Sequence, residues 1–142
     1  MKITANFTLE ELTRSATAKR NGIDNTPTKE VLERLTKLCE DILQPIRDRY
    51  GKPIVVTSGY RCPELNKLVK GSPTSQHQYG EAADIHTVSD TAEDNKKLFK
   101  LIEQMILDGD IVVGQLINEY DYNWIHVSLP TARHKNHIFS VK

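Results

Sequence analysis

The sequence predicts an α+β domain in which helices pack on one face of a small, mostly antiparallel sheet. Two segments, residues 27–46 and 91–107, repeat apolar side chains every three or four positions, as amphipathic helices do. Between and after them lie short segments that are β-branched or alternate polar with apolar residues, which is typical of strands. Strands that follow runs of helix in this way favour helices stacked on a sheet.

The first 50 residues predict two helices. Thr8 can cap the first, with Glu11 closing a capping box, and this helix is expected to end before Thr17. Thr26 is expected to cap the second helix, with a proline next to it in the first turn. Pro45 is expected to kink or end that helix, because it has no backbone N–H. The apolar stripe of the second helix comprises Val31, Leu32, Leu35, Leu38, Cys39, Ile42, Leu43 and Ile46.

The rest of the chain predicts one further clear helix, a helical turn or two over residues 63–69, and the strands of the sheet. The helix is expected over residues 91–107, and the strands over residues 53–57, 81–86, 111–119, 123–129 and 138–141. If Asp121 and Tyr122 form a two-residue hairpin turn, Glu119 pairs with Trp124. The same register places Ile117 opposite a histidine at position 126.

Composition limits the classes of partner. The 142 residues carry 19 Lys plus Arg and 19 Asp plus Glu, so a net charge of zero favours neither a nucleic-acid nor a membrane partner. No apolar run approaches the roughly 18–20 residues of a membrane span. The first residues lack the apolar core of a signal peptide, so we expect synthesis in the cytoplasm. Residues 1–142 are expected to form one domain.

The two cysteines do not suggest a metal site. Neither Cys39 nor Cys62 belongs to a C-x-x-C pair, and Cys39 is expected to be a buried thiol.

A metal-binding pattern lies between residues 75 and 84, where the sequence reads S-x-H-x-x-G-x-A-x-D. It places His77 and Asp84 seven residues apart, and Gly80 between them allows a sharp turn. A second histidine, His126, stands on an alternating strand and is expected to point away from the apolar face. Two imidazoles and one carboxylate, with a fourth position free, are the ligand set of a catalytic zinc. The pattern therefore predicts one Zn²⁺ ion.

Three further histidines are expected to lie outside the ligand set. His86 shares a strand face with Asp84, where it can support a ligand, face the substrate or be exposed at the end of the strand. His134 and His137 lie in a basic, polar tail and are expected to be solvated.

These motifs together resemble those of the zinc peptidases that cleave peptidoglycan stem peptides. That group includes D-Ala-D-Ala carboxypeptidases, dipeptidases and phage L-alanyl-D-glutamate endopeptidases, and its metal fold also occurs in the hedgehog signalling domain. The resemblance implies that His77, Asp84 and His126 are the ligands. It extends over nearly the whole chain and is strongest for the subgroup often found in phages and prophages. The segments that carry it are Phe7-Thr-Leu-Glu-Glu-Leu, Leu43-Gln-Pro-Ile-Arg47, Ser58-Gly-Tyr-Arg61-Cys-Pro-Glu-Leu-Asn66 and Gln115-Leu-Ile-Asn-Glu119.

The chain departs from this family at the catalytic base. The carboxypeptidases usually have Asp or Glu three residues before the last histidine, whereas this chain has Asn123, whose amide cannot take up a proton. Glu119 is the preferred substitute, since the hairpin register places it diagonally from His126, roughly 7–8 Å away. Asp121 in the turn is the alternative, and a third possibility is that no competent base is present.

Two further residues are expected to contact the substrate. The resemblance implies that Arg61 supports the substrate or a developing oxyanion, for which a guanidinium is well suited. The alternative for Arg61 is a structural ion pair. Ser75 is expected to order the ligand loop through its hydroxyl group and to contact the substrate.

The leading hypothesis is a zinc-dependent peptidase that hydrolyses peptide bonds in peptidoglycan stem peptides or cross-links with a metal-activated water. The alternative is a zinc-binding but non-catalytic module that binds the wall or belongs to a virion, and Asn123 favours it. A peptidase without a signal peptide is expected to reach the bacterial cell wall by release or on a virion. Oligomeric state and the bond cleaved are left open.

Overall fold

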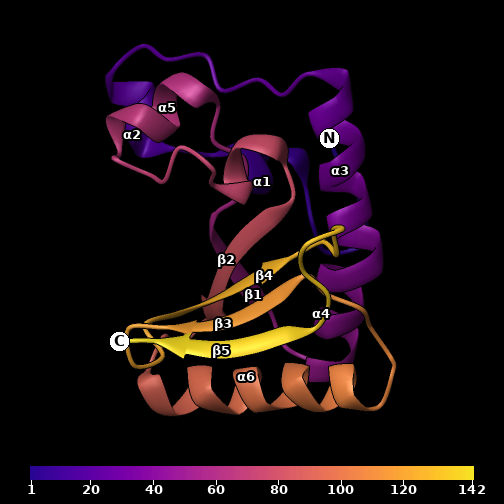
Figure 1. The fold of residues 1–142 in the computed structure, drawn as a ribbon. Helices are drawn as coiled ribbons and strands as arrows, with labels where there is room; N and C mark the ends of the chain where they lie inside the picture. Colours follow the sequence, from indigo (N-terminus) through magenta and orange to yellow (C-terminus); the bar gives the residue numbers. More distant parts are fainter.

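The computed structural model describes residues 1–142 and has the predicted α+β architecture (Figure 1). Five strands form one sheet in the order β1-β2-β4-β3-β5. Neighbouring strands pair antiparallel except for β5, which runs parallel to β3, so a mostly antiparallel sheet is confirmed. The strands are β1 (Ile54–Ser58), β2 (Ala82–Thr87), β3 (Gln115–Glu119), β4 (Trp124–Ser128) and β5 (His137–Val141).

The helices cover one face of this sheet and extend beyond one end of it (Figure 1). Helix α6 lies along the sheet, and the helical column α3–η1–α4 stands beside it. The core between helices and sheet contains fully buried Leu35, Ile46, Ile85, Ile102 and Ile125. The helical segments are α1 (Leu9–Thr13), α2 (Ala16–Arg20), α3 (Lys29–Leu38), the π-helical turn η1 (Cys39–Leu43), α4 (Gln44–Tyr50), α5 (Pro63–Leu68), the 3-10 turn η2 (Gln76–Tyr79) and α6 (Ala92–Leu107).

The predicted capping box at the start of α1 is confirmed. The hydroxyl of Thr8 accepts a hydrogen bond from Glu11 N, and the Glu11 carboxylate accepts one from Thr8 N, both at 3.2 Å. Helix α1 ends at Thr13, as expected, but a separate helix α2 then begins after Ser15 and includes Thr17.

The structure corrects the predicted cap of the long helix and decides how the helix passes Pro45. Thr28 caps it in place of Thr26, because the Thr28 hydroxyl accepts a hydrogen bond from Val31 N at 3.3 Å. The helical column continues past Pro45 to Tyr50 and is capped by Gly51, which has a left-handed φ of 75°, so Pro45 does not end it. The π-helical turn directly precedes Pro45, and a local change of helical pitch of this kind accommodates a residue that lacks an N–H.

The strand predicted over residues 111–119 is shorter than expected and begins at Gln115. Ile111 and Val113 are buried, but the backbone of Val113 bonds the loop residue Asn136 and not a strand. The hairpin turn spans residues 120–123 and is longer than the two residues expected. The predicted register is nevertheless correct, with Glu119 opposite Trp124.

The lengths and compositions of the helices bear on whether the protein could cross a membrane. None of them has the length and apolar character that crossing a bilayer would require.

Candidate active site

Three side chains converge on the sheet face that the core helices leave free. Asp84 from β2 and His126 from β4 are direct register partners, so both project from the same face of neighbouring strands. His77 comes from the turn η2, which packs on β2. One ligand atom from each of the three lies within 4.8 Å of the others, and the trio could hold a metal ion.

The orientation of His77 is set by a backbone carbonyl. Its Nδ1 lies 2.7 Å from the carbonyl oxygen of Gly59, which can only accept, so Nδ1 carries the proton. Nε2 is the nitrogen directed at the centre, and it faces Asp84 Oδ2 at 3.3 Å. Gly59 packs against the backbone of α1, where a Cβ would lie 2.3 Å from the carbonyl oxygen of Leu12, so this position has no room for a side chain.

His126 is held in an equivalent way by Gln76. Its Nε2 lies 3.0 Å from Oε1 of Gln76, an acceptor, so Nε2 carries the proton. Its Nδ1 lies 3.0 Å from Asp84 Oδ1 and is the nitrogen directed at the centre. In both histidines the nitrogen remote from the centre is hydrogen-bonded, an arrangement common around metal-binding histidines.

Asp84 is ionised at this site. Burial alone would raise the pKa of its carboxyl group, but hydrogen bonds from His126 and His77 and their positive charge lower it further than burial raises it. The net effect is a pKa well below the usual value of an aspartate. In their neutral forms the two imidazoles add one nitrogen lone pair each to this carboxylate, and that donor set fits a zinc ion.

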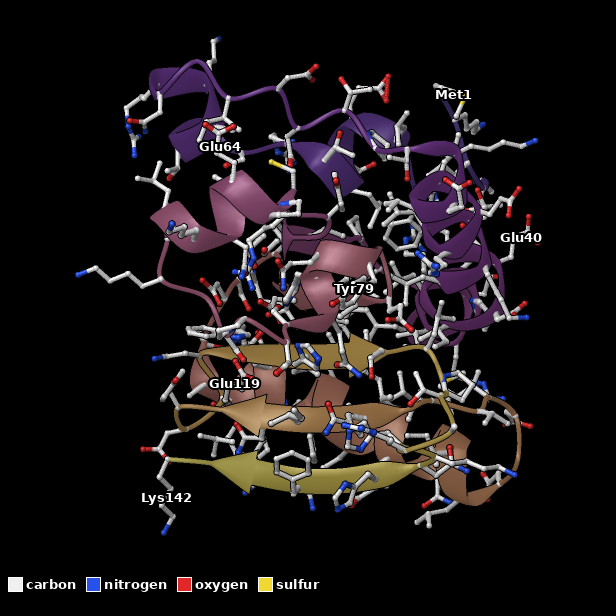
Figure 2. The ribbon with its side chains drawn as sticks, turned by 45° about the horizontal axis from the view of Figure 1, so that its top comes forward. Met1, Glu40, Glu64, Tyr79, Glu119 and Lys142 are labelled. Atoms are coloured by element: carbon white, nitrogen blue, oxygen red, sulfur yellow. The ribbon has the colours of Figure 1, made fainter.

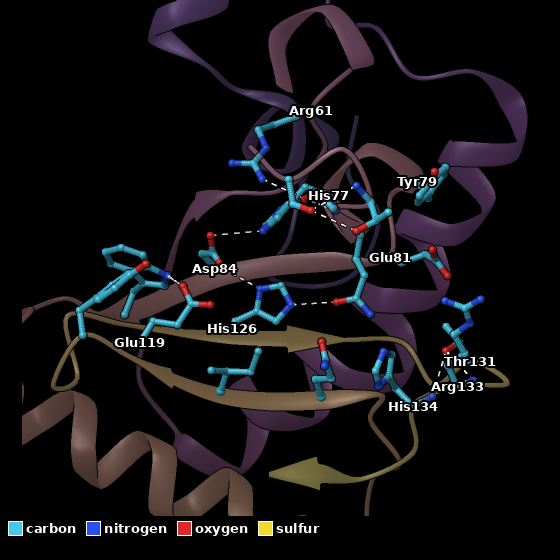
Figure 3. A pocket seen from close by; sticks show the side chains of 18 residues that line it. Arg61, His77, Tyr79, Glu81, Asp84, Glu119, His126, Thr131, Arg133 and His134 are labelled. Carbon is cyan, nitrogen blue, oxygen red and sulfur yellow. Dashed lines mark hydrogen bonds and ion pairs between the residues drawn. The ribbon is translucent and has the colours of Figure 1, made fainter. Parts of the chain in front are cut away.

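The three side chains lie in a cleft of about 670 Å³ (Figure 3). Glu119, Tyr120 and Trp124 line one end, and the loop with Thr131, Arg133 and His134 lines the other. Figure 2 shows two residues that line the cleft, Tyr79 on the turn above the strands and Glu119 at the end of β3.

Glu119 is the carboxylate at the aromatic end of the cleft. It is half-buried, and its Oε2 accepts a hydrogen bond of 2.6 Å from the indole N–H of Trp124. Asp121 and Asn123 are exposed in the hairpin turn and do not line the cleft. Among the residues considered for the base, Glu119 alone therefore lines the cleft that contains the candidate metal centre.

Arg61 and Ser75 meet above the metal centre. The Nη2 group of Arg61 donates a hydrogen bond to Ser75 Oγ at 3.0 Å, and that same oxygen accepts from His77 N. No carboxylate pairs with the guanidinium, and its Nε is buried without an acceptor. Burial lowers the pKa of Arg61, although Asp84 and Glu119 oppose this effect. Arg61 is therefore an unpaired cation in the cleft, and the structural ion pair considered for it is not present.

The remaining histidines divide differently from the prediction. His134 is half-buried and lines the cleft, so the expectation that it is solvated was wrong. His137 is exposed, as expected. His86 bonds the carbonyl oxygen of Thr87 and lies near Asp90, outside the cleft.

Gln76, Glu81 and Arg133 also line the cleft, although the sequence singled out none of them. Gln76 could have been found from the sequence, because it directly precedes the predicted ligand His77. Arg133 had none, because only the path of the loop after β4 brings it back to the cleft.

A largely buried His-Asp-His centre in an open cleft that also contains a carboxylate and an unpaired arginine is characteristic of a metallopeptidase. A family model described as Peptidase M15 matches residues 5–128, and the chain belongs to this family. Membership indicates a metal-dependent peptide hydrolase, and at the level of the family it supports a zinc-dependent enzyme acting on peptidoglycan. The comparison with curated proteins finds no match.

Proposed function

We propose that residues 1–142 act as one peptidase domain that uses a single zinc ion to hydrolyse peptide bonds in peptidoglycan stem peptides or their cross-links. The observation that carries the proposal is the convergence of three ligand atoms within 4.8 Å in a cleft that also contains Glu119 and Arg61. The M15 family supports the same class of reaction. The site of action is the bacterial cell wall, and the phage-like resemblance favours release from the cell or delivery on a virion.

In this proposal His77, Asp84 and His126 hold the ion through Nε2, a carboxylate oxygen and Nδ1. When bound, zinc supplies Lewis-acid polarisation of the scissile carbonyl group and lowers the pKa of water. Hydrogen bonds to Gly59 O and Gln76 Oε1 keep the two imidazoles oriented.

Glu119 is the general base and then the general acid. Trp124 occupies its Oε2, so Oε1 is free to accept a proton from the attacking water and to deliver it to the leaving amine. Arg61 faces the charge that develops on the carbonyl oxygen, and Ser75 fixes the orientation of its guanidinium. Ser75 also lines the cleft and lies within reach of the peptide.

The proposal is tested by measuring zinc content and by mass spectrometry of digested, purified peptidoglycan. H77A should lose both the bound metal and cleavage, whereas E119Q should keep the metal and lose cleavage. H137A is the matched control, since this histidine is exposed on β5 and should change neither quantity. Cleavage by metal-free H77A would overturn the mechanism.

The same experiment separates the enzyme from a non-catalytic zinc module of the wall or of a virion. Asn123 favoured that alternative, but it is exposed in the turn and Glu119 lies in the cleft, which supports catalysis. Stoichiometric zinc without any cleaved muropeptide would select the non-catalytic module.

A further inference from the structure

The cleft has a second charged region beyond the metal centre. Glu81 directly precedes β2, and Arg133 lies in the loop after β4; both line the cleft at the end remote from Trp124 (Figure 3). Because β4 runs from Trp124 toward this loop, the metal centre at His126 lies between the aromatic end and this charged end. A peptide bound across the centre therefore reaches both.

Backbone hydrogen bonds tie the segment that carries Glu81 to the start of the loop that carries Arg133. Leu129 N donates to the carbonyl oxygen of Glu81 at 2.8 Å, and the turn that carries Arg133 begins two residues later. Thr131 N donates to the carbonyl oxygen of His134 at 2.9 Å, and the Thr131 hydroxyl accepts from His134 N at 3.2 Å. Hydrogen bonds therefore fix the backbone of the loop that forms the charged end of the cleft.

The charges at this end are opposite and unpaired. Glu81 is half-buried and Arg133 is exposed, and neither side chain takes part in an ion pair of the structure. A substrate group with only a carboxylate would be repelled by Glu81, and one with only an ammonium would be repelled by Arg133. A group that carries both charges suits the two side chains together.

We propose that the Glu81–Arg133 end of the cleft binds a zwitterionic amino-acid group on the substrate, an ammonium and a carboxylate on the same carbon. This inference rests on the proposed function and names its substrate class, which is stem peptides with a free amino-acid end on a side chain. Arg133 binds the carboxylate with its planar guanidinium, and Glu81 binds the ammonium. Both are specificity-determining residues and take no part in the chemical step.

Three synthetic stem peptides test the proposal. They are identical except at one side chain, which ends in meso-diaminopimelate, in its carboxamide without the carboxylate, or in its N-acetyl form without the ammonium. Dissociation constants are measured by calorimetry on the metal-loaded E119Q variant, in which the peptides persist, and cleavage of each is followed with the unmodified protein. The diaminopimelate peptide should bind about 5- to 10-fold more tightly than either derivative, the net effect of one typical hydrogen bond.

Single substitutions assign each preference to one side chain. R133Q should abolish the preference over the carboxamide, and E81Q should abolish the preference over the N-acetyl form. K135Q removes the same charge as R133Q from the same loop, but Lys135 does not line the cleft, so both preferences should persist. Equal binding of the three peptides, or an equal effect of K135Q and R133Q, would overturn the inference. Discrimination in binding without any cleavage would leave the inference standing and overturn the proposed peptidase.

Discussion

The indole N–H of Trp124 donates a 2.6 Å hydrogen bond to Oε2 of Glu119, and the two residues are register partners on β3 and β4. The pairing of the strands thus brings donor and acceptor together. It leaves one oxygen of the carboxylate free on the cleft side of the sheet. The rings of Tyr120 and Trp124 pack edge to face, with their centroids 5.1 Å apart, and this contact further restricts the orientation of the indole.

Replacing the proposed base is expected to remove turnover without removing the metal. E119Q keeps the size of the side chain and its contact with Trp124 but cannot accept a proton, so kcat should fall by about 10²- to 10⁴-fold. Zinc content should be unchanged, because Glu119 is not among the ligands. Steady-state kinetics on a purified muropeptide and metal analysis measure the two effects.

Asp121 provides the control for this assignment. It is exposed in the turn and lies outside the cleft, so D121N should keep the activity of the unmodified protein. If D121N were inactive while E119Q retained turnover, the base would have been assigned to the wrong residue.

Trp124 is expected to act through Glu119. W124F preserves an aromatic ring but removes the hydrogen-bond donor, and we expect kcat to fall by about 10-fold, the kinetic equivalent of about 1.4 kcal/mol. In the E119Q background the same substitution should have a much smaller effect, because the carboxylate that Trp124 orients is absent. Additive losses in the double variant would contradict this role.

Gln76 is expected to strengthen metal binding through His126. Q76A removes the acceptor that orients the imidazole, and loss of such a partner typically weakens metal affinity by about 10- to 100-fold. Competition with a chromophoric chelator measures the affinity. Q78A is the matched control on the same turn, since the side chain of Gln78 donates a hydrogen bond to the carbonyl oxygen of Pro73 and not to a ligand. Equal affinities of the two variants would show that Gln76 is dispensable.

Gly80 is expected to be intolerant of any side chain. Its φ is 74°, and a Cβ there would lie 2.8 Å from the carbonyl oxygen of Val31 in α3. G80A should therefore lower the free energy of unfolding by about 2–4 kcal/mol, from backbone strain together with overpacking. G109A shares the positive φ, at 78°, but has open space around the new methyl group, so its loss should be about 1 kcal/mol. Urea denaturation compares them; equal losses would mean that the contact with α3 is unimportant.

Cys39 is expected to be unreactive in the folded protein and to weaken the fold at alkaline pH. Burial raises its pKa to about 12 from 9.0, an effect that the nearby charges of Glu11 and Glu40 reinforce. The unfolded thiol therefore ionises first, and the contribution of Cys39 to stability is complete below pH 9 and declines as pH rises toward 12. C62S should show no native reaction with a thiol reagent at pH 8 and one thiol after unfolding.

The matched comparison is C39V in the same C62S background, which cannot ionise. Its free energy of unfolding relative to C62S should improve by about 1.4 kcal/mol between pH 7 and pH 10. A pH-independent difference between the two proteins would contradict the buried, neutral thiol.

Local signals in the sequence predicted the parts of the fold that depend on local physics. The capping box of Thr8 and Glu11 needs only four residues, and the register that pairs Glu119 with Trp124 follows from a short turn between two strands. Thr26 and Thr28 offer the same hydroxyl group, however, and nothing local ranks them. In the structure Thr28 is the cap, and the residue whose N–H it binds, Val31, is buried in the core.

Long-range contacts decided what the sequence could not predict. The metal ligands were identifiable because their spacing and residue types are specific, and Asp84 and His126 meet as expected of strand neighbours. Arg133 and His134 lie in a polar segment whose composition resembles that of any solvated loop. Their place at the cleft depends on backbone bonds to Glu81 and Val113, which are remote in the sequence and carry no local pattern.

The direct pairing of Asp84 with His126 has a consequence for how the protein handles its metal. Two of the three ligands are set by the hydrogen-bonded ladder between β2 and β4, and the third by a carbonyl oxygen of the loop after β1. The cage is thus assembled by the fold itself and does not need the ion as a template. Chelation should leave an intact apoprotein that can be reloaded, and cobalt could then serve as a coloured substitute that reports on the coordination sphere.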